Sequence, residues 1–226
     1  MVDHDKVPDA AVVAMALNDL SRAAENSNTP WALIGGQALR AYGVPRHTLD
    51  ADALVPVEDL LRLADVLVVT FHWKALKYSD EDAGYVVATE PTVLLMDDPV
   101  LFDVQEQRNM IALESNAGLV VELLAAQHPV EMDMVTGSGF RTHEGILVPV
   151  APLGGILLVK TKADRSKDRA AIEQTAEHLS RTRIDDAIAW ADKKDPATAD
   201  DLRALVNAVH VRRRPNGTSS SIQRKR

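Results

Sequence analysis

Two aspartates stand one residue apart in a segment that otherwise has the composition of a buried strand. The segment is LDADALV, residues 49–55, in which Asp50 and Asp52 alternate with apolar residues. On a strand these two side chains project to the same face, about 7 Å apart. Two carboxylates on one face repel each other, and burying them without compensation costs several kcal/mol. We therefore expect positive charge at this face. Divalent cations would supply it, and Mg²⁺ in particular prefers oxygen ligands such as these carboxylates.

The residues before the aspartates predict a strand, a tight turn and a short helix. The apolar run WALIGG, residues 31–36, ends in a double glycine, and GQALRAYG, residues 36–43, is typical of a two-turn helix that closes at Gly43. Gly35 and Gly36 let the backbone approach a ligand closely and turn its amides toward an anion. A double glycine alone is more often structural, but its place ahead of the two aspartates favours phosphate binding.

A third acid is expected on a neighbouring strand. The segment GLVVELLAAQHPVEMDMVTG, residues 118–137, predicts two strands around His128-Pro129. In the second of these, Glu131 and Asp133 alternate with apolar residues, and we assign Asp133 as the third carboxylate with Glu131 as the alternative. The other aspartate pairs lie in polar contexts, where a solvated turn or helix end explains them.

The rest of the chain alternates helix and strand and then becomes helical. Helices are predicted at 9–25 and 58–67, strands at YVVAT, TVLLM and LFDVQ, and four further helices at about 153–164, 167–182, 184–193 and 199–211. This order predicts an α/β (α+β) fold, a mixed twisted sheet with flanking helices and a helical C-terminal part. The expected divisions are a domain over 1–151 that carries the two aspartates, a helical part over 152–211 that completes the same site, and a basic, disordered tail over 212–226.

Composition and charge narrow the setting. The 226 residues include no cysteine, which excludes disulfides and thiolate metal sites. The N-terminal residues lack the basic start of a signal peptide, and no apolar stretch reaches about 20 residues, so we expect a cytoplasmic protein with no membrane partner. The tail from Arg212 contributes +6 to the net charge of −8, so the rest of the chain carries −14. An acidic body does not suggest a broad nucleic-acid surface, although the tail is able to touch phosphates.

The strand, the double glycine, the short helix and the pattern Arg46-x-Thr48-x-Asp50-x-Asp52 together resemble the signature of the DNA polymerase beta-like nucleotidyltransferase superfamily. This form is closest to the abortive-infection and type IV toxin–antitoxin branch. That branch also has a strand with a third acid and a later phrase similar to VPVAPLGGILLVKTKADRSKD, residues 148–168. The resemblance runs from Trp31 to Asp168, with residues 57–117 matching only in general character.

The resemblance implies the fold of that superfamily and a Mg²⁺-dependent (or Mn²⁺-dependent) nucleotidyltransferase that moves a nucleoside monophosphate from a nucleoside triphosphate to an acceptor hydroxyl. It implies three metal ligands, one of which also helps to remove the proton of the attacking hydroxyl, and several phosphate ligands. The implied metal ligands are Asp50, Asp52 and Asp133, the last being the one that assists proton removal. The implied nucleotide-binding residues are Gly35, Gly36, Arg46, Thr48 and Lys160, with Thr48 either binding a phosphate or fixing the strand.

Lys160 and Asp168 each allow two interpretations. Lys160 continues the apolar stripe of Leu153, Ile156 and Leu157, so it either extends to solvent or meets a buried anion such as a phosphate. Asp168 follows Ser166 in the first turn of a predicted helix, where exposed amides favour an acid. The resemblance implies instead that Asp168 is a catalytic or substrate-orienting acid.

The resemblance also implies a toxin that modifies RNA, with the 3′ end of tRNA as the leading acceptor and a cognate antitoxin as partner. Two other classes stay open. One is transfer to a small molecule such as an aminoglycoside, which is cationic and suits the acidic body better than tRNA does. The other is a non-catalytic nucleotide-binding protein, against which the three carboxylates argue.

Overall fold

The computed structural model describes residues 8–79, 84–91, 94–96 and 108–213, and within them the chain forms one mixed sheet with helices around it. The order of the strands is β4-β3-β6-β7-β2-β1-β9-β8, and β5 pairs with β6. Their bounds are β1 Ala32–Ile34, β2 Asp50–Pro56, β3 Lys74–Ser79, β4 Gly84–Val87, β5 Leu94–Met96, β6 Arg108–Glu114, β7 Val120–Ala126, β8 Gly139–His143 and β9 Ile146–Val150. The expected α/β fold with a mixed sheet is confirmed.

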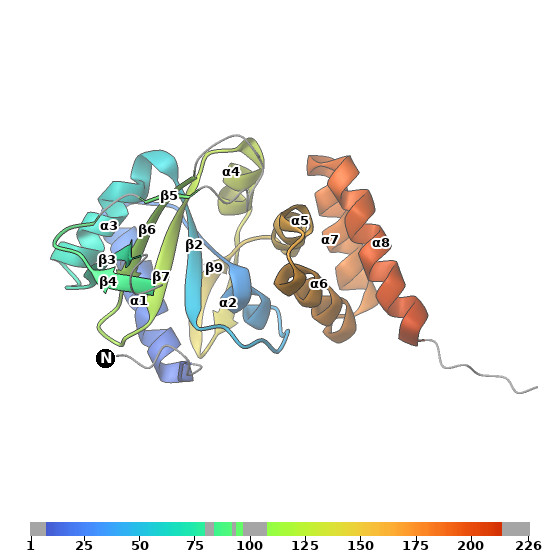
Figure 1. Ribbon diagram of the computed structural model, residues 1–226, viewed down its shortest axis with the longest axis horizontal. Coiled ribbons are helices and arrows are strands. Elements are labelled where there is room, and N and C mark those ends of the chain that lie inside the picture. Colours follow the sequence, from blue (N-terminus) through green and yellow to red (C-terminus); the bar gives the residue numbers. More distant parts are fainter. Residues whose placement is uncertain (1–7, 80–83, 92–93, 97–107, 214–226) are drawn as a thin grey trace, which may run out of the picture.

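The helices fall into two groups. α1 (Ala10–Ser27) and α3 (Leu60–Val69) pack on each other and on the sheet, while α5 to α8 gather at one end of the molecule with α7 and α8 outermost (Figure 1). The remaining bounds are α2 Gly35–Ala41, η1 (3-10) Val57–Asp59, α4 Pro129–Thr136, α5 Leu153–Ala163, α6 Ser166–His178, α7 Arg181–Lys194 and α8 Pro196–Arg213. The helices predicted before and after residue 152 are confirmed to within a few residues. In the described part of the chain, every helix is too short or too polar to cross a membrane.

β2 lies near the middle of the sheet and has two different faces. It pairs parallel with β7 and antiparallel with β1, which places Asp52 opposite both Glu122 and Ile34. Ala51 and Ala53 are fully buried in the core, whereas Asp50 and Asp52 turn to the other face. The predicted alternation of LDADALV is therefore confirmed, and it aims both carboxylates away from the α1–α3 core.

The segment PVEMDMV, residues 129–135, is the helix α4 and not the expected strand. Pro129 occupies the first helical turn, where its missing N–H costs nothing. His128 caps the helix by accepting a hydrogen bond from the N–H of Val130 in the first turn, and the Glu131 carboxylate accepts hydrogen bonds from the N–H groups of His128 and Gln127. This reciprocal capping satisfies the exposed amides of the first turn and favours helix over strand. The first half of the same segment is a strand, β7, as predicted.

Other strands were only partly anticipated. YVVAT and TVLLM overlap β4 and β5, while LFDVQ lies outside the described residues. β3, β6, β8 and β9 were not predicted. The apolar positions of β3, β8 and β9 are interrupted by charged residues or by glycine and proline, whereas β6 contains an uninterrupted apolar run, residues 110–113, that was missed.

Two glycines let α5 approach its neighbours closely. A Cβ atom on Gly154 would lie 2.4 Å from the carbonyl oxygen of Ala187 on α7, and one on Gly155 would lie 2.6 Å from Cγ of Met134 on α4. Both distances are shorter than real Cβ atoms tolerate. The position of α5, which carries Lys160, is thus set by contacts with α4 and α7 that only glycine allows.

Candidate active site

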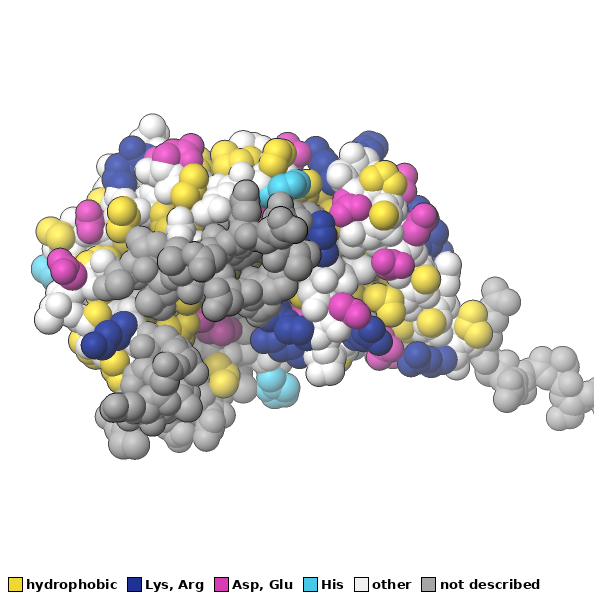
Figure 2. Space-filling model, turned by 45° about the horizontal axis from the view of Figure 1, so that its top comes forward, with side chains coloured by type: hydrophobic (Ala, Val, Ile, Leu, Met, Phe, Trp, Pro, Cys, Tyr) yellow, Lys and Arg dark blue, Asp and Glu magenta, His cyan; other side chains and the backbone are white. Residues whose placement is uncertain are grey.

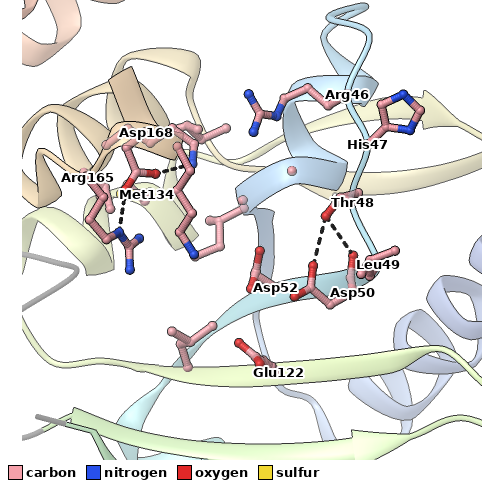
Figure 3. Close-up of a pocket in the computed structure, with 18 residues that line it drawn as sticks. Arg46, His47, Thr48, Leu49, Asp50, Asp52, Glu122, Met134, Arg165 and Asp168 are labelled. Atoms are coloured by element: carbon pink, nitrogen blue, oxygen red, sulfur yellow. Dashed lines mark hydrogen bonds and ion pairs between the residues drawn. The ribbon is translucent and has the colours of Figure 1, made fainter. Parts of the chain in front are cut away.

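Three carboxylates meet on the open face of the sheet. Asp50 and Asp52 come from β2 and Glu122 comes from β7, and one ligand oxygen from each lies within 4.8 Å of the others (Figure 3). The side chains converge because Asp52 and Glu122 are direct neighbours across a parallel pair, while Asp50 is two residues away on the same face. This set of oxygen atoms is what Mg²⁺ or Mn²⁺ prefers.

The carboxylates are held together at an electrostatic cost. Burial, followed by the charges of Asp50 and Glu122, raises the pKa of Asp52 to about 8. Burial also raises the pKa of Glu122, although the hydroxyl of Tyr85 on β4 donates a 2.7 Å hydrogen bond to this carboxylate and opposes the rise. Bound divalent cations would remove this repulsion, so the residues fit a metal site.

The structure corrects the expected third carboxylate. Asp133 lies on α4, where 44% of its side chain is exposed and its carboxylate accepts a 2.5 Å hydrogen bond from Lys194. The alternative, Glu131, is fully buried but holds the start of α4. Glu122 takes the place in the cluster. The sequence contained an indication of this role. Glu122 is an acid within the apolar run 119–126, just as Asp50 and Asp52 are acids within an apolar segment.

Thr48 and the double glycine set the positions of the two aspartates. The Thr48 hydroxyl donates a 2.9 Å hydrogen bond to Oδ1 of Asp50. Gly35 has a φ of +64°, and a Cβ there would lie 1.7 Å from Oδ2 of Asp52; a Cβ on Gly36 would lie 2.5 Å from Oγ1 of Thr48. The glycines are therefore required for the start of α2 to lie directly over the carboxylate strand.

Lys160 and Asp168 form one unit on the opposite side of the pocket. The ammonium of Lys160 donates a 3.0 Å hydrogen bond to Asp168, and Arg165 donates one of 2.6 Å to the other oxygen of the same carboxylate (Figure 3). The Asp168 side chain is only 1% exposed. Burial opposes its ionisation, but the hydrogen bonds and charges of Arg165 and Lys160 hold its pKa below the ordinary value. Lys160 thus neither extends freely to solvent nor lies unpaired, and Asp168 faces cations and not the carboxylate cluster.

The carboxylates and cations line a single pocket of about 600 Å³. Arg46 enters it from the loop before β2; its Nε is buried without a hydrogen-bond partner, and one terminal nitrogen lies 3.4 Å from Gln174. Burial lowers the pKa of Arg46, and the charge of Asp168 partly offsets this. Lys167 also lines the pocket, with apolar walls from Leu124, Met134, Ile156 and Val159. Figure 2 shows Lys and Arg side chains gathered where the sheet meets the helical part.

The sequence-predicted residues are thus mostly brought together. Eight of the nine line this pocket: Gly35, Gly36, Arg46, Thr48, Asp50, Asp52, Lys160 and Asp168. Asp133 does not line it. His47, which neighbours Arg46, turns its ring away from the carboxylates (Figure 3).

Comparisons with known proteins find a likeness in overall structure only. No protein-family model and no curated protein matches the chain. Two solved structures of the antibiotic-resistance factor ANT(2'')-Ia are similar: a solution structure (15% identity, 90% of this chain and 91% of that chain, TM-score 0.43) and a crystal structure with adenylyl-2''-tobramycin (14% identity, 90% and 99%, TM-score 0.44). A nucleotidyltransferase-like protein from Paracoccidioides brasiliensis matches with 16% identity over 84% of this chain and 91% of that chain, TM-score 0.43. At these levels of similarity, the function has to be argued from the geometry of the pocket.

Proposed function

We propose that the chain is a Mg²⁺-dependent nucleotidyltransferase. The observation that carries this proposal is the pairing of opposite charges across one pocket. Three converging carboxylates form the floor, and the cations Arg46 and Lys160 lie above and opposite them. A triphosphate bound with its cation needs both kinds of ligand at once, oxygen donors for the metal and positive charges for the phosphates.

The metal would be held by Asp50, Asp52 and Glu122, which offer oxygen ligands within 4.8 Å of one another. Burial, and after it the charge of neighbouring carboxylates, raises the pKa values of Asp52 and Glu122, and such a cation would stabilise their ionised forms. When bound, Mg²⁺ or Mn²⁺ would offset charge on the attacking and leaving oxygens of the transfer reaction. Thr48 keeps Asp50 in one orientation through its hydroxyl, so its role is to fix the strand.

The transfer step needs a base and a stabilised leaving group. The acceptor hydroxyl oxygen bonds to the α-phosphorus, the bond from that phosphorus to the pyrophosphate oxygen breaks, and pyrophosphate leaves. Glu122, whose pKa is raised by burial, is the carboxylate that we place in the role of proton acceptor. Arg46 and Lys160 face the phosphates, and Asp168 fixes Lys160 and Arg165 as a pair, which makes Asp168 a positioning residue.

For the acceptor, we propose an RNA end, with tRNA first, in a toxin that a cognate antitoxin restrains. The support is the order Arg46-x-Thr48-x-Asp50-x-Asp52, which resembles the toxin branch, together with the basic tail from Arg212. The second candidate is a small cationic acceptor such as an aminoglycoside. It is favoured by one observation, the charge of −14 on the chain without its tail.

The test is transfer of label from each nucleoside triphosphate, with Mg²⁺, to total tRNA or to a panel of aminoglycosides. Wild type should label the 3′ end of RNA with one preferred nucleotide, and Asp52→Ala should label nothing. Asp133→Ala is the matched control, because it removes an aspartate that lies outside the cluster and should keep full activity. The wild type, but not Asp52→Ala, should arrest growth when it is expressed alone.

The outcomes show separately which acceptor is used and whether the transfer reaction occurs at all. Label on an aminoglycoside with none on RNA would exclude the RNA acceptor and retain the transferase. Nucleotide binding without transfer to any acceptor would favour a non-catalytic protein. Equal loss of activity in Asp133→Ala and Asp52→Ala would contradict the assignment of Glu122 as the third carboxylate.

A further inference from the structure

A second groove lies between the end of α2, strand β8, the start of α5 and one side of α7. Its volume is about 330 Å³, and it shares no lining residue with the carboxylate pocket. Its polar and aromatic lining comes from Tyr42, Arg141, Arg183, Asp186 and Trp190. Because the nucleotidyl transfer proposed above uses none of these side chains, the groove needs an explanation of its own.

Two arginines lie around one tyrosine ring in this groove. The guanidinium carbon of Arg141 is 4.0 Å from the centre of the Tyr42 ring, and that of Arg183 is 5.6 Å from the same point. The ring is fixed, since Tyr42 is 7% exposed and its hydroxyl donates a 2.9 Å hydrogen bond to the carbonyl of Ala151. Each contact with the ring is favourable, but the two positive charges repel each other.

Neither arginine has a counter-ion in the part of the chain that the structure describes. Nε of Arg141 is buried without a hydrogen-bond partner, and Asp186, which lines the same groove, forms no ion pair with either guanidinium. Most other described arginines pair with carboxylates, in keeping with the excess of acidic over basic residues: Arg40, Arg62, Arg165, Arg169, Arg181, Arg203 and Arg212. A buried donor without a partner costs about 1–3 kcal/mol, and an anion in the groove would satisfy it.

We propose that this groove binds a phosphate group of a single-stranded oligonucleotide. The guanidiniums of Arg141 and Arg183 present donors that match phosphate oxygens, and the groove keeps a net positive charge with Asp186 included. Trp190 is half-buried on the groove wall and offers an aromatic surface for a base next to the phosphate. An acidic peptide would supply carboxylates but no ring to stack on Trp190.

The test follows the fluorescence of Trp190, since the other tryptophans, Trp31 and Trp73, are buried elsewhere. Wild type in EDTA, without metal or triphosphate, is titrated with inorganic phosphate, with a short single-stranded RNA and with a glutamate tetrapeptide. The double variant Arg141→Gln/Arg183→Gln should weaken binding of both phosphate ligands roughly 10- to 100-fold. The matched control is Arg181→Gln, which removes a charge on the same helix from a residue paired with Asp185 and should change neither affinity more than about twofold.

The results decide both the site and the source of the phosphate. RNA binding tighter than inorganic phosphate supports the oligonucleotide, whereas equal affinities would overturn the oligonucleotide as the source of the bound phosphate. Unchanged affinities in the double variant, or tetrapeptide binding as tight as RNA, would overturn the proposal. A melting curve recorded by circular dichroism shows whether loss of Arg141 unfolds the protein. If it does, the single variant Arg183→Gln, at an exposed position, is used for the same titrations. Because no metal or triphosphate is present, failure here leaves the proposed transferase reaction untouched.

Discussion

Replacing Asp52 by asparagine should change how stability depends on pH. Its folded-state pKa of about 8 lies above the value near 4 of an unfolded chain. Between these values the folded state keeps a proton that the unfolded chain has released. The stability that this proton contributes is complete below pH 4 and is lost as the pH rises toward 8.

The expected magnitude follows from that difference. One extra bound proton changes the free energy of unfolding by about 1.4 kcal/mol per pH unit, so metal-free wild type should lose nearly 3 kcal/mol between pH 5 and pH 7. For a chain of this size, that loss is on the order of 5–10 °C in Tm. Asp52→Asn carries no titrating proton and relieves the repulsion with Asp50 and Glu122, so its stability should fall much less over the same range.

Urea unfolding in EDTA at pH 5, 6 and 7 measures this difference. Asp133→Asn makes the same chemical change at an aspartate that is paired with Lys194, and it should follow the wild-type curve apart from a constant offset. Adding Mg²⁺ should stabilise wild type more at pH 8 than at pH 6, because metal binding requires the ionised carboxylates. Parallel pH profiles of wild type and Asp52→Asn would refute the reasoning, and so would an equal response of both to Mg²⁺.

Three other substitutions test the surroundings of the cluster. Asp168→Asn should cost about 3 kcal/mol in urea unfolding, because it leaves two cations beside a buried neutral amide, and wild-type stability near pH 7 would be the contrary result. Gly35→Ala should destabilise the protein by well over the 1–2 kcal/mol of a positive φ, since the new Cβ meets Asp52, whereas Gly118→Ala at a φ of +87° meets nothing and should show only the backbone cost. Arg46→Gln should keep Tm and weaken triphosphate binding roughly tenfold by calorimetry, and unaltered affinity would exclude it as a phosphate ligand.

The parts of the structure that local patterns govern were predictable. The period-two alternation around Asp50 and Asp52 defines β2, because one face of that strand is in the core. The helices after residue 152 follow from their apolar spacing and from the punctuation by proline and glycine. In both cases, the residues that determine each helix or strand lie within that element or directly next to it.

The third carboxylate was not predictable in the same way. Alternating acids in 129–135 fit a strand, but the local capping signals of Pro129 and of His128 with Glu131 decide for a helix. The partnership of Glu122 with Asp52 depends on β7 lying parallel to β2, which is a pairing between distant segments that no local pattern encodes. Likewise, the partner of Lys160 lies on the next helix, so its apolar stripe indicates only that the ammonium is half-buried.

The contact between Gly155 and Met134 affects the width of the pocket, although both residues lie outside the carboxylate cluster. The chain crosses from the sheet to the helical part at Ala151 and Pro152, so the separation between the carboxylate floor and Lys160 is set by packing and not by covalent geometry. Gly155 fits against Met134 with no room for a methyl group. A larger side chain there would push α5 outward and carry the Lys160 ammonium away from a bound triphosphate, so turnover would drop while the carboxylates stayed intact. If the chain has the proposed function, variation along the α4–α5 contact would therefore tune nucleotide affinity while every residue proposed to bind metal or phosphate stays unchanged.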